Sequence, residues 1–257
     1  MKISKLILAI AALIFFGCSV HKDAKSPLIF KNNSIKVYAK ITTDEFPKAS
    51  LTLLTPDSIV AVGNNKFNYE VSDYSLKNQS PSAIINSLAN SAKGQHIHFI
   101  VDNKPYQAKY EPNFNAELTP GPHLILAFLS RSFHESVKTE EAFSLKQYLL
   151  GDTQHLIANI DNDEMLFYSR PKGTYNLENS KKVLLDFYLV NTKLSKNGNK
   201  VRVILNGDSF NVDEWQPYII EGLTVGEHTI QIELIDNKGI AIPGTYNNSD
   251  LRKFIIK

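Results

Sequence analysis

Residues Gly94–Asn103, with the sequence GQHIHFIVDN, have a counterpart 104 residues later, Gly198–Gly207 with the sequence GNKVRVILNG. In both segments a glycine opens a run in which every second residue is apolar, and Asp or Asn ends it. This alternation predicts a β-strand with one buried face. Two more pairs of segments show the same relation: Leu118–Ile125 with Leu223–Ile230, and Phe67–Leu76 with Leu185–Leu194. The chain therefore repeats one unit of about 100 residues.

The surrounding sequence predicts an all-β fold. Runs rich in Val, Ile, Tyr, Phe and Thr are short, and turn residues separate them at intervals typical of antiparallel sandwiches. The repeated segments resemble bacterial immunoglobulin-like (Ig-like) domains of extracytoplasmic proteins, which implies two tandem Ig-like antiparallel β-sandwiches. We expect the first over residues 35–150 and the second over 151–257. The three segments would be the second, third and sixth strands, with the third and sixth as neighbours.

The first residues predict export and a lipid anchor. Lys2 and Lys5 precede an apolar run that is too short to span a bilayer, which is typical of a secretory signal peptide over residues 1–17. The run ends at Gly17-Cys18-Ser19, which resembles a lipobox, and Cys18 is the only cysteine in the chain. We therefore expect a lipid on Cys18, a tether over residues 18–34, and an outer-membrane protein facing the periplasm or the surface.

Charge and missing motifs exclude several functions. Without residues 1–17 the chain holds 26 basic and 26 acidic residues, so no basic footprint for nucleic acid is expected. The sequence carries no Gly-x-Ser-x-Gly, His-Glu-x-x-His or phosphate-loop motif. We therefore expect a binding protein without a cofactor rather than an enzyme.

The second copy of the repeat serves as a control for the first. His123 and His228 occupy the same position in both copies, which favours a structural role. His96 and His98 instead replace Lys200 and Arg202, and charged residues mark the outward face of a strand. We expect the two histidines on the outer face of the sheet. They would lie beside an apolar strip where the second copy has polar residues, formed by Leu124, Leu126 and Phe128.

Two loops of the first copy are more elaborate than those of the second. Residues 77–93 replace a loop of three residues, and Ser80-Pro81 followed by apolar residues at helical spacing predicts a short inserted helix that Gly94 ends. The loop after the sixth strand reads Ser130-Arg131-Ser132-Phe133-His134. Both loops should meet the start of the His96 strand.

These features predict a ligand-binding site at one end of the first sandwich, formed by His96, His98, Arg131, Ser132 and His134. Its ligand would be an envelope protein, a peptide or a small anion, and the membrane is a partner through the lipid. As an alternative, His96, His98 and His134 would bind zinc or copper. A third interpretation is a phosphopeptide-binding module, because Ser130-Arg131-x-x-His134 together with Asn206-Gly207 resembles forkhead-associated domains. Residues 94–134 also resemble an uncharacterised family of histidine-rich periplasmic domains, which implies a fold but no mechanism.

Overall fold

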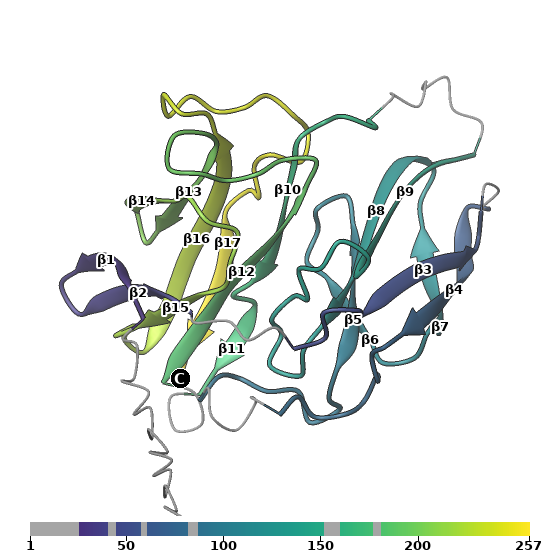
Figure 1. The fold of residues 1–257 in the computed structure, drawn as a ribbon, viewed down its shortest axis with the longest axis horizontal. Helices are drawn as coiled ribbons and strands as arrows, with labels where there is room; N and C mark the ends of the chain where they lie inside the picture. The colour runs from purple at the N-terminus through teal and green to yellow at the C-terminus, as the bar shows by residue number, and fades with distance from the viewer. Residues whose placement is uncertain (1–25, 41–44, 58–60, 82–86, 152–159, 177–180) are drawn as a thin grey trace, which may run out of the picture.

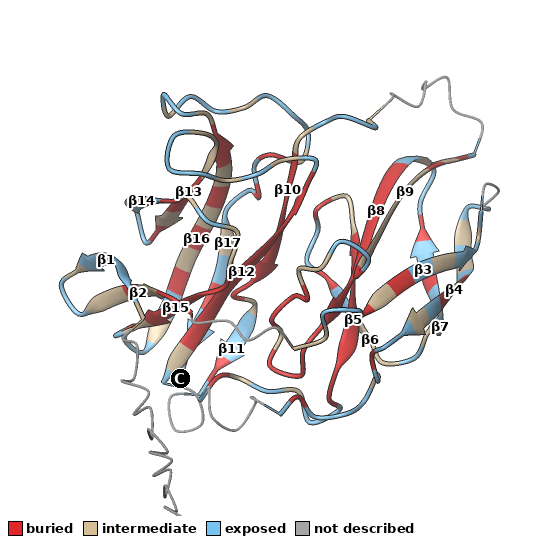
Figure 2. Cartoon of the chain, in the orientation of Figure 1, coloured by how far each residue is buried: buried red, intermediate tan, exposed pale blue. Residues whose placement is uncertain are grey.

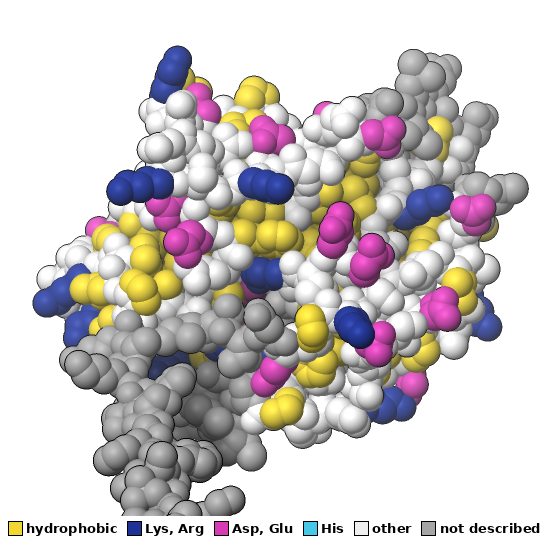
Figure 3. Space-filling view, viewed as in Figure 1, with side chains coloured by type: hydrophobic (Ala, Val, Ile, Leu, Met, Phe, Trp, Pro, Cys, Tyr) yellow, Lys and Arg dark blue, Asp and Glu magenta, His cyan; other side chains and the backbone are white. Residues whose placement is uncertain are grey.

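The computed structural model describes residues 26–40, 45–57, 61–81, 87–151, 160–176 and 181–257. Within these residues every regular element is a β-strand, labelled β1 to β17 in Figure 1. The strands form four sheets that pair into two sandwiches lying side by side (Figure 1). This confirms the all-β class. Basic and acidic side chains are scattered over the face drawn in Figure 3.

The N-terminal sandwich packs a three-stranded sheet on a four-stranded one. The first sheet has the order β3 (Ser50–Thr55), β4 (Gly63–Ser72) and β7 (Asn113–Leu118). The second has the order β6 (Gln107–Lys109), β5 (His96–Val101), β8 (Gly121–Ser130) and β9 (Phe143–Leu150). Inward residues such as Phe67, Phe99 and Tyr148 form one core cluster between the two sheets.

The C-terminal sandwich packs two five-stranded sheets. One has the order β1 (Leu28–Asn32), β2 (Ile35–Ala39), β15 (Tyr218–Glu221), β12 (Lys182–Val190) and β10 (Met165–Arg170). The other has the order β11 (Gly173–Tyr175), β17 (Arg252–Ile256), β16 (Gly226–Ile235), β13 (Lys200–Leu205) and β14 (Asp208–Val212). A second core cluster, which includes Phe187, Val203 and Ile232, fills the space between them.

The internal repeat is visible in the strand pairing. β5 pairs antiparallel with β8, and β13 pairs antiparallel with β16, so the third and sixth strands are neighbours in both sandwiches. Nδ1 of His123 lies 2.6 Å from Oδ2 of Asp102, and Nδ1 of His228 lies 2.8 Å from Nδ2 of Asn206. The other ring nitrogen contacts the carbonyl oxygen four residues earlier, at 2.9 and 2.8 Å. The structural role predicted for His123 and His228 is confirmed.

The start of the first sandwich differs from the prediction. Residues 28–39 form the β1–β2 hairpin, which extends the sheet of the C-terminal sandwich through the pairing of β2 with β15. The hairpin lies there because Val37 and Ala39 bury their side chains in the core of that sandwich. Residues 28–32 are therefore a paired strand rather than tether. Strands of the C-terminal sandwich come both before and after the N-terminal sandwich in the chain, so no single boundary separates the two.

A third core cluster joins the two sandwiches. Leu124, Leu126 and Phe128 are completely buried, and the Phe128 ring stacks on Tyr188 of β12 with centroids 4.6 Å apart. The apolar strip predicted on the outer face of the first sandwich is therefore covered by the second. Figure 2 shows the result, since β5, β8, β10 and β12 are buried along most of their length.

Hydrogen bonds support this packing. The side chain of Asn103, just after β5, donates from Nδ2 to the carbonyl of Leu166 at 3.2 Å and accepts at Oδ1 from the backbone N–H of Tyr168 at 3.1 Å. Both partners lie on β10, the last strand of its sheet. Asn103 therefore satisfies backbone groups that an edge strand would otherwise leave unpaired.

Two predictions concern segments that are only partly described. The described residues near the expected helix form turns and a bridge at Leu88, so no helix is found in them, and residues 82–86 lie outside the description. The signal peptide and Cys18 lie in residues 1–25, which also lie outside it. No helix in the described parts of the chain is long and apolar enough to cross a membrane.

Candidate metal-binding site

Three histidines meet where the N-terminal sandwich faces the C-terminal one. Ile97 and Phe99 point into the core of their own sandwich, so the alternation of β5 turns His96 and His98 to the opposite face. His134 reaches the same place from the turn that follows β8. His96 and His98 are completely buried. The prediction of the outward face was correct, but the C-terminal sandwich covers that face.

The ring nitrogens of the three histidines lie close together. Nε2 of His96 is 3.0 Å from Nε2 of His98 and 3.2 Å from Nδ1 of His134. One donor nitrogen from each ring can be chosen so that all three lie within 4.8 Å of one another. In a tetrahedral site with metal–nitrogen bonds of about 2.0–2.1 Å, ligand nitrogens are separated by ~3.3 Å. The two distances from Nε2 of His96 are therefore close to those of a three-histidine metal site.

The remaining ring nitrogens hold two of the histidines in place. Nδ1 of His96 donates to the carbonyl of Gly94 at 2.8 Å, so its neutral ring has a bare Nε2. Nδ1 of His98 lies 3.1 Å from Oγ of Ser169, which belongs to β10 of the other sandwich. Metal-binding histidines commonly use their second nitrogen in this way, which fixes the tautomer and the ring orientation.

Hydrogen bonds to neighbours can also satisfy this cluster. Nε2 of His98 can donate to the bare Nε2 of His96, Oγ of Ser169 can donate to Nδ1 of His98, and the hydroxyl of Tyr106, 3.3 Å away, can donate to Nδ1 of His134. The 3.2 Å contact between Nε2 of His96 and Nδ1 of His134 then joins two nitrogens that carry no proton. A cation among the three nitrogens would bind both of these lone pairs.

The backbone of His134 is itself unusual. Its φ angle is +69°, in the left-handed region that few residues other than glycine adopt. The turn is held by the N–H of His134 donating to the carbonyl of Arg131 at 2.9 Å. The conformation turns the His134 ring toward His96, with ring centroids 4.9 Å apart, and places its Nδ1 3.3 Å from the hydroxyl of Tyr106.

The surroundings keep the histidines neutral. Burial, opposed by the hydrogen bond to Gly94 and aided by the guanidinium of Arg170, lowers the pKa of His96 to about 4. Burial also places the pKa of His98 and of His134 well below the ordinary value, with nearby positive groups acting in the same direction. The neutral imidazole is the form that binds a metal ion, so no proton competes at pH 7.

Four neighbours of the histidines were not found from the sequence. Tyr106 stacks on His98 with ring centroids 3.6 Å apart. Ser169 bonds His98, and Arg170 and Lys172 contribute the positive charge. Three of the four come from the β10–β11 region of the other sandwich, and no local pattern in the sequence connects that region with the His96 strand.

Arg131 and Ser132 have other partners. Arg131 forms ion pairs with Glu45 and Glu135, the latter with Nε and Oε1 3.3 Å apart. The N–H of Ser132 donates to Oγ of Ser80 at 3.0 Å, and the N–H of Ser80 returns a bond to Oγ of Ser132 at 3.1 Å. Both residues are buried. The predicted five-residue site is therefore not an exposed loop surface: three members form the histidine cluster, and two belong to internal polar networks.

Comparisons with known proteins assign this chain to no family. No family model and no curated protein matches the chain. Among solved structures, the fibronectin(III)-like modules of Clostridium thermocellum CbhA match with a TM-score of 0.26 and 12% identity, over 80% of this chain and 94% of theirs. SGBP-B of the Bacteroides ovatus mixed-linkage glucan utilization locus, in complex with a heptasaccharide, matches with a TM-score of 0.22 and 12% identity.

That match covers 80% of this chain but only 47% of SGBP-B, so the chain spans about half of that structure. The two tandem V-type regions of the v-region-containing chitin binding protein VCBP3 match with a TM-score of 0.24 and 11% identity, over 81% of this chain and 99% of theirs. At such TM-scores, these similarities carry no information about what the chain binds.

Proposed function

We propose that this chain is a metal-binding protein that holds one Zn²⁺ or copper ion through His96, His98 and His134. The observation that carries the proposal is the pair of nitrogen–nitrogen distances, 3.0 and 3.2 Å, around the bare Nε2 of His96. Neutral imidazoles are good ligands for both metals, and a three-histidine set leaves a fourth position for water or another ligand.

The second neighbours support the proposal. Gly94 and Ser169 each bond the Nδ1 of a different histidine, which leaves the two Nε2 atoms 3.0 Å apart and, among the residues that the structure describes, free of other partners outside the cluster. Ser169 belongs to the other sandwich, so both sandwiches build the site. Apolar side chains would stabilise the interface more than three histidines if the cluster had no other role, because buried polar groups cost free energy unless each has a hydrogen-bond partner.

We further propose that the protein is exported and anchored by a lipid on Cys18, as a non-enzymatic component of the cell envelope. The lipobox-like sequence Gly17-Cys18-Ser19 and the single cysteine support this. Metabolic labelling of expressing cells with an alkyne fatty acid should mark the wild-type chain and leave Cys18→Ser unmarked. Labelling of both chains, or of neither, contradicts the anchor.

The metal site is tested by calorimetric titration of the full chain carrying Cys18→Ser, which removes the only thiol. We expect one ion of Zn²⁺ or Cu²⁺ per chain with a Kd below about 1 μM, equivalent to about 8 kcal/mol. His96→Asn and His134→Asn should abolish this binding, and Asn suits the positive φ angle of residue 134. His228→Asn is the matched control, because that histidine is also largely buried but lies outside the cluster.

Ser169→Ala distinguishes a metal-binding role of the three histidines from a role in packing alone. Loss of the hydroxyl should weaken metal binding about 10–100-fold, the range typical of residues that orient a metal ligand. It should also cost about 1–3 kcal/mol of stability in the metal-free protein, because Nδ1 of the buried His98 then lacks this partner. The proposal fails if the wild-type chain binds neither ion, or if His96→Asn binds as tightly as His228→Asn.

A further inference from the structure

A cavity lies along the seam between the two sandwiches. It has a volume of about 280 Å³, and we call it the seam pocket. Its wall includes charged side chains of both signs and one indole, contributed by Glu45, Arg131, Glu135, Lys138 and Trp215. Trp215 comes from the C-terminal sandwich, and the other four come from the N-terminal part of the chain. Unlike the histidine cluster, the seam pocket is open to solvent.

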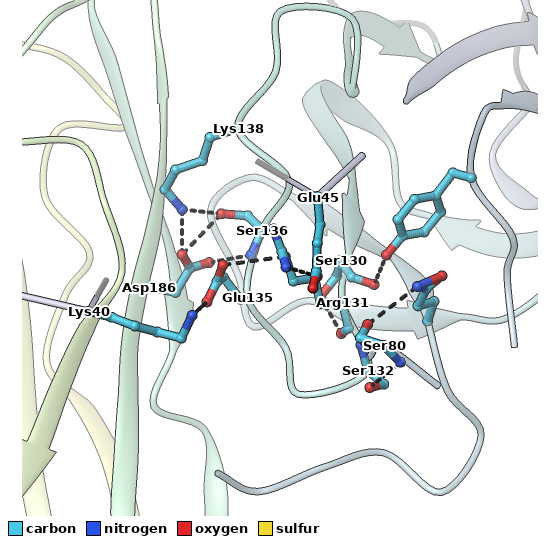
Figure 4. Close-up of polar contacts among 12 residues, drawn as sticks. Lys40, Glu45, Ser80, Ser130, Arg131, Ser132, Glu135, Ser136, Lys138 and Asp186 are labelled. Atoms are coloured by element: carbon cyan, nitrogen blue, oxygen red, sulfur yellow. Dashed lines mark hydrogen bonds and ion pairs between the residues drawn. The ribbon is translucent and has the colours of Figure 1, made fainter. Parts of the chain in front are cut away.

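Charged residues in and beside the seam pocket form two groups of ion pairs, shown in Figure 4, which we together call the network. Arg131 pairs with Glu45 and Glu135, and Nζ of Lys40 lies 2.8 Å from Oε2 of Glu135. Nζ of Lys138 lies 2.6 Å from Oδ1 of Asp186. Lys40 and Asp186 reach the network from the C-terminal sandwich, as Figure 4 shows. Positive and negative groups are equal in number, so the network is neutral.

Stability alone does not account for this network. Arg131 and Glu135 are 5% and 3% exposed at the side chain, and the Asp186 side chain is completely buried. Removing charges from water costs several kcal/mol per ion, and an apolar replacement of a buried ion pair is often neutral or stabilising. Such networks of donors and acceptors beside a cavity are typical of binding sites, where a few convergent polar groups orient a ligand.

The neutrality of the network defines the kind of ligand. An ionic ligand would have to displace an existing partner, because every charge in the network already faces an opposite one. A hydroxyl group can donate to a carboxylate lone pair and accept from an ammonium or guanidinium N–H at the same time. A compound with several adjacent hydroxyl groups can therefore add to the ion pairs without breaking them.

Trp215 supplies the apolar surface that such a compound also needs. Its Nε1 donates to the carbonyl of Phe187 at 3.1 Å, and its ring packs edge-on against Tyr188 with centroids 5.0 Å apart. The indole is therefore held in one orientation while part of it lines the seam pocket. A rigid aromatic wall beside paired charges suits a ring with polar edges and an apolar face.

We propose that the seam pocket binds a neutral sugar, one ring at a time. The volume lies just below the usual range of about 300–1,000 Å³ for small-molecule sites, which leaves room for a single pyranose ring. Carboxylates of the network accept from the ring hydroxyls, Lys138 donates to them, and the C–H face of the ring lies on Trp215. The site is independent of the metal proposed above, because none of the three histidines lines it.

The chain offers a direct readout, because Trp215 is its only tryptophan. The full chain in EDTA is titrated with glucose, galactose, mannose and N-acetylglucosamine, and in parallel with glucuronate and glycine as charged comparators. Tryptophan fluorescence and saturation-transfer NMR are recorded together. We expect at least one neutral sugar to bind saturably with a Kd of about 1 mM or tighter, and the charged compounds to bind at least tenfold more weakly.

Two variants and one control locate the binding. Glu45→Gln should weaken it at least tenfold by removing a charged acceptor, and Glu45 is exposed enough for the fold to survive. Trp215→Phe, followed by NMR, should weaken it by a similar factor. Glu214→Gln changes an exposed neighbour outside the seam pocket and should bind as the wild type does.

The inference is overturned if no neutral sugar binds at 50 mM by either method, where the concentration is chosen about 50-fold above the expected Kd. It is equally overturned if the charged compounds bind and the sugars do not, or if Glu45→Gln and Glu214→Gln behave alike. Because the titration is made in EDTA, its outcome does not depend on the metal site.

Discussion

Lowering the pH from 7 to 5 should destabilise the metal-free chain through its three clustered histidines. An unfolded histidine titrates with a pKa of about 6.5, whereas burial holds the pKa of folded His96 at about 4. Between these values the unfolded state binds a proton that the folded state does not. Stability is therefore fully present above pH 6.5 and falls as the pH drops toward 4.

The size of the effect follows from this difference. For each histidine held neutral, the free energy of unfolding falls by about 1.4 kcal/mol per pH unit below 6.5, or by about 2 kcal/mol at pH 5. The pKa values of His98 and His134 are shifted in the same direction, so the three together account for about 6 kcal/mol. That is a large part of the total stability of a typical domain, about 5–15 kcal/mol.

Urea unfolding in EDTA at pH 7, 6 and 5 measures this loss, and His96→Asn/His134→Asn is compared with the wild type. Between pH 7 and 5, the free energy of unfolding of the variant should fall by about 4 kcal/mol less than that of the wild type, whatever the variant's stability at pH 7. All other titrating groups are shared by the two chains. Parallel pH profiles for the wild type and the variant would refute the assignment of buried, neutral histidines.

Three further predictions concern packing and backbone. Phe128→Ala empties the core that joins the two sandwiches and should cost about 3–5 kcal/mol in urea unfolding; a cost below 1 kcal/mol would mean that the sandwiches do not depend on this core. Asp186→Ala leaves the ammonium of Lys138 without its carboxylate and should cost about 3–5 kcal/mol in urea unfolding. An unchanged urea midpoint would contradict this prediction. Gly94→Ala should destabilise the protein far more than Gly173→Ala. Both glycines have a positive φ angle, which costs an alanine about 1–2 kcal/mol. A Cβ at residue 94 would in addition lie 2.1 Å from a carbonyl oxygen, whereas a Cβ at residue 173 would meet open space. Equal thermal shifts for the two would contradict the described loop.

Local sequence patterns predicted much of the fold correctly. The alternation around Ile97 and Phe99 identified β5, its inward face and its counterpart β13. The paired positions of His123 and His228 separated structural histidines from the others. These features depend on residues close together in the chain, and strand periodicity or repetition at a fixed spacing reports them directly.

The failures concern contacts between distant segments. Residues 28–32 were expected to be tether, because the three apolar residues Leu28, Ile29 and Phe30 between polar neighbours do not reveal that the next strand pairs with β15. Arg131 was expected to offer its charge to a ligand, because a sequence cannot show that Glu45, 86 residues earlier, lies beside it. In both cases the partners are far away in the chain.

The sequence by itself determined the repeated all-β unit, the face of β5 that carries His96 and His98, and the histidines worth attention. Only the tertiary structure decided what covers that face. Leu126 and Phe128 form an apolar surface that any apolar partner could bury, and the partner proved to be the second sandwich. Burial under that sandwich turns outward-facing histidines into a neutral, closely spaced cluster, because desolvation and the approach of β10 exist only after the two sandwiches pack.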